Sequence, residues 1–105
     1  MAKKTIMLVC AAGMSTSLLV SKMQKAAKDE EISAKIFAAA ASDTDNQIKK
    51  QHPDILMLGP QVRYLEEDYA KKLDIPVRVI NMQDYGSMNG EKVFKDALFT
   101  LNEQN

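Results

Sequence analysis

The sequence predicts an α/β protein in which a four-stranded parallel sheet carries helices on both faces. Four short apolar segments, each of strand length, alternate along the chain with four segments of helical period. The connections between the apolar segments are short, and crossovers between parallel strands are right-handed, which places helices on both sides of the sheet. We therefore expect a doubly wound fold with the strand order 2-1-3-4.

Length and composition limit the possible functions. The chain has 105 residues and is 46% hydrophobic, which fits one domain over 1–105 and a monomer. Fourteen basic residues balance fourteen acidic ones, so no nucleic-acid partner is expected. The single cysteine and the lack of a signal sequence indicate a cytoplasmic protein. The apolar runs fall far short of the roughly 20 residues that span a membrane, so membrane association would need a partner.

The first strand and helix have the clearest patterns. A continuous apolar run over 5–9 predicts a strand that is buried on both faces. A helix is expected over 16–28, because apolar residues recur there at helical spacing while lysines occupy the opposite side. The expected inward-facing residues are Leu19, Met23, Ala26 and Ala27.

The middle of the chain predicts two further strands and a short helix. Alternation from Ile32 to Ala38 indicates a second strand near a sheet edge. Ser42, followed three residues later by Asp45, resembles a capping box and predicts a short helix to about residue 50. The apolar run 55–58 stops at Gly59 and Pro60, as expected for a central strand that ends at a functional edge.

The last third predicts two helices, a strand and a loop. The first helix is amphipathic, and Pro76 separates it from a strand over 77–80. A loop is expected over 81–89 and a final helix over 90–101. The inward-facing residues are expected to be Val62, Leu65, Tyr69 and Leu73 in the first helix, and Val93, Phe94, Ala97, Leu98 and Leu101 in the last.

The stretch 10–17 is the candidate site. Ligands of doubly wound folds bind beyond the carboxyl ends of the strands where the strand order reverses, here between strands one and three. The segments at those ends are 10–17 and 59–63, with the loop that holds Tyr85 close by. The first N–H groups of a helix lack partners and carry the positive end of its dipole, so a phosphate fits in the turn after the first strand.

Cys10 is the candidate nucleophile of this turn. A lone cysteine is commonly just a small buried hydrophobe, but a helix N-terminus favours the nucleophilic thiolate. Gly13 permits a positive φ, and Ser15, Thr16 and Ser17 supply hydroxyl groups, one of which also suits the helix N-cap. The expected product is a phosphocysteine. No metal or cofactor is expected, because a second cysteine is lacking and the only histidine, His52, is interpreted as a loop residue.

The loop also invites comparison with tyrosine phosphatases, in which an arginine six positions after the cysteine clamps the phosphate. Thr16 occupies that position here, and no acid or base that could activate water flanks the site. The phosphoryl group is therefore expected to be kept for transfer. A low-molecular-weight phosphatase or an arsenate-reductase-like hydrolase stays open as the alternative. A receiver-type signalling module is disfavoured, because no acidic cluster follows the first strand.

The motif residues resemble one known family. The run from Val9 to Ser17, with the segment 58–61 and the pair Tyr85-Gly86, is similar to the lactose/cellobiose (chitobiose) type IIB component of the bacterial phosphoenolpyruvate-dependent sugar phosphotransferase system. The resemblance spans nearly the whole chain and implies a fold like that of low-molecular-weight phosphatases. It implies a phosphocarrier that takes phosphate from a phosphohistidine of the IIA protein and passes it to a disaccharide held by the membrane component IIC.

The resemblance also assigns roles by position. Cys10 would be the phosphoacceptor, and Gln61 and Tyr85 would lie on the rim that faces the partners. The lack of a fused membrane segment favours cellobiose or chitobiose over lactose. The residues expected to bind phosphate are Ala11, Ala12, Gly13, Met14, Ser15, Thr16 and Ser17.

Overall fold

A four-stranded parallel sheet forms the centre of the molecule. The computed structural model describes residues 3–11 and 14–103. Its strands follow the order β2-β1-β3-β4, and every neighbouring pair is parallel, which confirms the predicted topology. The strands are β1 (Lys4–Cys10), β2 (Ala34–Ala40), β3 (Ile55–Leu58) and β4 (Val77–Val79).

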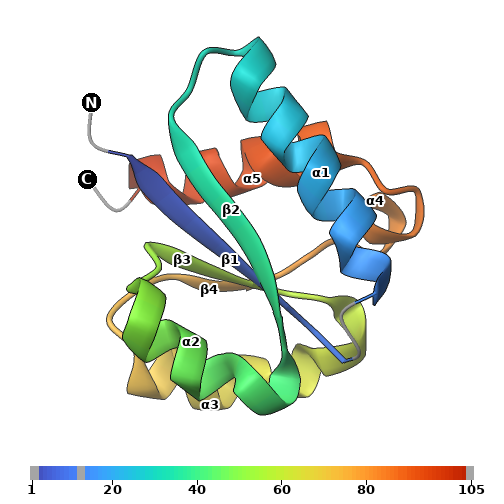
Figure 1. Cartoon of the computed structure of the whole chain (residues 1–105). Coiled ribbons are helices and arrows are strands. Elements are labelled where there is room, and N and C mark those ends of the chain that lie inside the picture. Colours follow the sequence, from blue (N-terminus) through green and yellow to red (C-terminus); the bar gives the residue numbers. More distant parts are fainter. Residues whose placement is uncertain (1–2, 12–13, 104–105) are drawn as a thin grey trace.

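Helices cover both faces of this sheet, as predicted. Figure 1 shows α1 and α5 on one face, with α2 and α3 on the other. The two layers enclose separate hydrophobic clusters, one built with α1 and α5 and one with α2 and α3. The α-helices are α1 (Met14–Asp29), α2 (Thr44–Gln51), α3 (Glu66–Lys72), α4 (Met82–Gly86) and α5 (Gly90–Glu103); the 3₁₀ helices are η1 (Ala41–Asp43) and η2 (Pro60–Leu65).

The central strand β1 explains why the first apolar run has no polar alternation. Ile6 and Leu8 belong to the cluster under α1 and α5, whereas Met7 and Val9 belong to the cluster under α2 and α3. Successive side chains of a strand point to opposite faces, so a strand covered on both sides must be apolar throughout. β1 is therefore held from both faces up to Cys10.

The start of α2 differs from the expected capping box. Asp43, not Ser42, is the N-cap residue, and η1 occupies the position where the helix was expected to begin. The Asp43 carboxylate accepts hydrogen bonds from the side-chain amides of Asn46 and Gln47 rather than from backbone N–H groups. The capping-box prediction was wrong, because these side chains bind the acid that would otherwise cap the helix.

Two segments after β3 also differ from expectation. The helix expected around Val62 and Tyr69 is divided into η2 and α3, since Val62 adopts a non-helical conformation (φ −117°, ψ 24°). Both of those side chains still face the predicted core. The predicted loop 81–89 contains the five-residue helix α4, so the prediction of an irregular segment was wrong there.

Candidate functional site

The carboxyl ends of the two central strands meet at one edge of the sheet. Cys10 is the last residue of β1 and pairs with Ala40 of β2. On the other side, the N–H of Gly59, just after β3, donates to the carbonyl oxygen of Val9 at 2.8 Å. The segment that contains Cys10 and the segment that begins at Gly59 are therefore neighbours.

The thiol of Cys10 is enclosed by two polar contacts. Its side chain is buried, and Sγ donates to the carbonyl oxygen of Ala39 over 3.7 Å. The hydroxyl of Thr16, in the first turn of α1, donates to Sγ at 2.9 Å. Thr16 is fully buried as well. A hydroxyl group therefore lies within hydrogen-bond distance of the sulfur in the interior of the protein.

The predicted phosphate-binding residues lie between β1 and the start of α1. Ala11 is exposed directly after the strand, and Ser17 is exposed near the start of the helix. Ala12 and Gly13 lie outside the described residues, as do the side chains of Met14 and Ser15, whose backbones open α1. Helix α1 begins four positions after Cys10, two residues earlier than expected. The start of α1 thus follows Cys10 closely in the chain.

A pocket of about 640 Å³ adjoins this edge. A Cβ added at Gly59 would lie 3.3 Å from the Val9 carbonyl oxygen and 3.5 Å from Cε1 of Tyr85. Gly59 therefore separates the end of β1 from the Tyr85 ring, which lines the pocket. The lining includes Pro60, Gln61, Arg63, Tyr64, Met82 and Tyr85.

The two predicted rim residues have different surroundings. Gln61 is exposed, whereas Tyr85 is buried and packs in the cluster under α1 and α5 while also lining the pocket. Sequence reasoning missed Tyr64 and Met82, which are 71% and 63% exposed. Met82 gave no signal within an expected loop, whereas Tyr64 could have been noticed as an aromatic at a solvent-facing position shortly after Gly59-Pro60.

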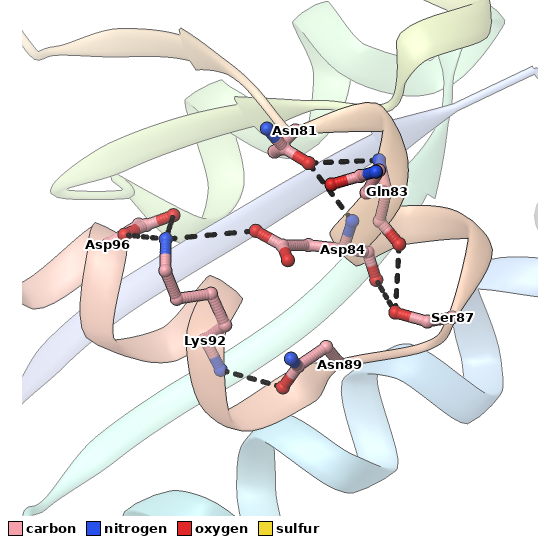
Figure 2. Close-up of polar contacts among 7 residues, drawn as sticks. All are labelled: Asn81, Gln83, Asp84, Ser87, Asn89, Lys92 and Asp96. Carbon is pink, nitrogen blue, oxygen red and sulfur yellow. Dashed lines mark hydrogen bonds and ion pairs between the residues drawn. The ribbon is translucent and has the colours of Figure 1, made fainter.

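A polar network fixes α4, the helix that carries Tyr85 (Figure 2). The side-chain oxygen of Asn81 accepts from the N–H groups of Gln83 at 2.9 Å and Asp84 at 3.1 Å. Lys92 of α5 bonds Asp96 at 3.0 Å and approaches Asp84 to 3.8 Å. The hydrogen bond to Asp96 raises the pKa of Lys92 above its usual value. Helix α4 is thus capped at its start and tied to α5.

Replacing Asn81 by alanine is expected to lower the free energy of unfolding by about 1 kcal/mol, because the first N–H groups of α4 lose their acceptor. Urea denaturation followed by circular dichroism measures the change. Asn81→Asp keeps an acceptor oxygen and is expected to retain most of the stability. Equal stability of Asn81→Ala and the unchanged protein would contradict the capping role.

Neither a metal site nor a membrane span is found in the described part of the chain. Within residues 3–11 and 14–103, no three His, Cys, Asp or Glu side chains come together in a group that could hold a metal ion. The helices described are all too short or too polar to cross a membrane.

Comparison with known proteins gives consistent matches over nearly the whole chain. A family model described as "PTS system, Lactose/Cellobiose specific IIB subunit" matches residues 5–96. Two Lactococcus lactis proteins each cover 97% of this chain and align over their full length: the cellobiose-specific EIIB component of subsp. lactis (strain IL1403), 52% identical, and the galactose-specific EIIB component of subsp. cremoris (strain MG1363), 51% identical. The solution structure of a cellobiose-specific IIB component from Borrelia burgdorferi is 40% identical with a TM-score of 0.80, covering 97% of this chain and 94% of that one.

Proposed function

This chain belongs to the lactose/cellobiose-specific IIB family of the sugar phosphotransferase system, and from that membership we propose that Cys10 carries the phosphoryl group. The protein is a IIB component for sugars of the cellobiose and lactose class, with the phosphatase-like fold of IIB domains, and its relatives do not support the hydrolase alternative. One observation carries the proposal: the only cysteine of the chain ends the central strand just before α1.

The proposed reaction has two phosphoryl transfers. In the first, the S–P bond of Cys10 forms as the P–N bond of a phosphohistidine breaks, and the thiol proton passes, in net terms, to the freed imidazole. In the second, a sugar hydroxyl forms an O–P bond while the S–P bond breaks, and the hydroxyl proton restores the thiol. Positioning and charge stabilisation supply most of the acceleration in such transfers. This makes the protein a phosphohistidine-dependent sugar phosphotransferase that acts through phosphocysteine.

The segment from Ala11 to Ser17 is proposed to hold the phosphoryl oxygens, chiefly with backbone N–H groups at the start of α1. The side chain of Thr16 and the carbonyl of Ala39 are the described groups in hydrogen-bond contact with the Cys10 sulfur. Neither is a base that could activate water, so transfer is favoured over hydrolysis.

IIB components work with a IIA protein and a IIC component. For this chain we infer a cytoplasmic, monomeric domain over 1–105 that meets the membrane only through IIC. Gln61, Tyr85 and the exposed Tyr64 and Met82 form the proposed docking rim, because their pocket adjoins the Cys10 edge. The docking must be transient, so a small interface is expected.

The sugar is proposed to be a disaccharide, with cellobiose or chitobiose preferred. Two relatives of nearly equal identity are named for cellobiose and for galactose, which supports a sugar class more than one sugar. The deciding experiment supplies the protein with labelled phosphoenolpyruvate, the general phosphocarriers, IIA, and membranes that contain IIC. The label is expected first on this protein and then on a disaccharide. Failure to accept label from IIA would refute the proposed function.

Met82→Asp is expected to lower kcat/KM for phosphorylation by IIA about tenfold, because it places a charge in the apolar part of the docking rim. Initial rates at several IIA concentrations measure this effect. Phe99→Asp is the matched control, since Phe99 is 67% exposed on α5 and does not line that pocket. An equal loss of kcat/KM in Met82→Asp and Phe99→Asp would show that the pocket is not part of the docking surface.

A further inference from the structure

We propose that the Thr16 hydroxyl acts on the Cys10 sulfur itself and stabilises its negative charge, both when sulfur attacks phosphorus and when it leaves. This inference rests on the proposed phosphocysteine role of Cys10. It gives Thr16 a task different from that of a phosphate-binding loop residue, because the atom stabilised is the nucleophile and not a phosphoryl oxygen.

The geometry of the pair supports this assignment. Thr16 Oγ1 lies 2.9 Å from Cys10 Sγ, and the two residues are 0% and 2% exposed. A hydrogen bond to a charged acceptor is stronger than one between neutral groups, and low local dielectric strengthens it further. The contact connects the end of β1 to the first turn of α1, so both partners are held by regular structure.

The second contact of the sulfur has the opposite effect on charge. The carbonyl oxygen of Ala39 lies 3.7 Å from Sγ. It accepts a hydrogen bond from the neutral thiol, but its partial negative charge repels a thiolate. It therefore favours the resting thiol. Thr16 can donate to sulfur in both protonation states, so its hydroxyl offsets the carbonyl when the sulfur becomes charged.

The same hydroxyl serves both transfers. As the P–N bond of phosphohistidine breaks and the S–P bond forms, the attacking sulfur gives up its proton. As the O–P bond to the sugar forms, the electron pair of the S–P bond returns to sulfur. In both steps Sγ carries more negative charge in the transition state than in the resting thiol or in the phosphocysteine. A hydrogen bond that strengthens with this negative charge therefore accelerates the step.

The test is alkylation of Cys10 by iodoacetamide in the purified chain, with no phosphocarrier present. Thr16→Val removes the hydroxyl and keeps the shape of the side chain. We expect alkylation about tenfold slower at neutral pH, with the pH–rate profile displaced towards higher pH. Thr16→Ser should restore the rate because it restores the donor. Thr100→Val is the matched control, since Thr100 is a buried threonine whose hydroxyl bonds a carbonyl of its own helix.

The outcomes separate this inference from the proposed function. A wild-type alkylation rate in Thr16→Val would overturn the role of Thr16 on sulfur, even if phosphorylation by IIA slowed, because a hydroxyl that binds only phosphoryl oxygens leaves the free thiol unaffected. The two results can also differ in the other direction. If Thr16→Val is alkylated more slowly but the unchanged protein cannot accept phosphate from IIA, the role of Thr16 on sulfur is supported and the phosphocarrier function is refuted. If Thr16→Val does not fold, Thr16→Ala in the same assay decides, with the same expected loss.

Discussion

Replacing Cys10 by serine is expected to abolish phosphoryl acceptance, with a loss on the order of 10³-fold or more. A serine hydroxyl stays protonated at neutral pH, and the described contacts of this position are a carbonyl oxygen and a threonine hydroxyl, neither of which is a base. Intact mass after incubation with phosphoenolpyruvate, the general phosphocarriers and IIA measures the effect. The unchanged protein is expected to gain one phosphoryl group and Cys10→Ser none.

His52 provides the control for that experiment. It is the only histidine, the other residue type that commonly carries phosphate in such transfers, and it is exposed at the end of α2 with φ 49°. Asparagine tolerates this left-handed conformation, so His52→Asn should fold and accept phosphate normally. Loss of acceptance in His52→Asn together with full acceptance in Cys10→Ser would place the phosphoryl group on histidine and overturn the proposal.

Gly90→Ala is expected to lower the free energy of unfolding by about 2–3 kcal/mol. A Cβ at Gly90 would lie 2.5 Å from Cβ of Lys22 and 2.7 Å from both the Lys22 carbonyl carbon and the Met23 nitrogen. Because backbone atoms of α1 are involved, α1 and α5 would have to separate. Urea unfolding curves, compared at equal slope, measure the loss.

Gly86→Ala is the matched control, since a Cβ there meets no atom within 4 Å. Its stability should stay within about 0.5 kcal/mol of the unchanged protein. Gly90→Ala should also slow phosphorylation of the fraction that remains folded, because α1 carries Thr16. If the two alanine variants were equally stable, the close approach of α1 and α5 at Gly90 would be refuted.

The sheet was predictable because burial determines its sequence pattern. β1 and β3 are covered on both faces, so each appears as an unbroken apolar run, and the order β2-β1-β3-β4 follows from short right-handed crossovers. α4 was missed because five residues are too few to show a helical period. The available signal was Asn81, an N-cap residue type whose side chain does accept from the backbone of α4.

The candidate site was predictable in part. The strand, turn and helix around Cys10 follow from local pattern, and so does the proximity of the segment after Gly59. The contact between Thr16 and the sulfur could not be predicted, because it depends on where α1 begins and on side-chain orientation. The assignment of Thr16 to phosphate binding stays a prediction, and the structure adds a contact between its hydroxyl and the sulfur. Tyr85 was taken as a loop residue, but it packs in the core because α4 turns it inward.

The central position of β1 has a consequence for folding. Part of the surroundings of Cys10 comes from distant parts of the chain: Ala39, whose carbonyl oxygen accepts from the thiol, lies 29 residues further along, and the N–H of Gly59 donates to the carbonyl oxygen of the neighbouring Val9. Contacts this distant in sequence require costly loop closure and slow the formation of parallel sheets. A newly made segment that contains only β1 and α1 therefore has Cys10 and Thr16 but lacks the strands β2 and β3 that flank β1. The thiol of Cys10 becomes buried only once the chain has closed both crossovers, so its protection from solvent can serve as a measure of completed folding.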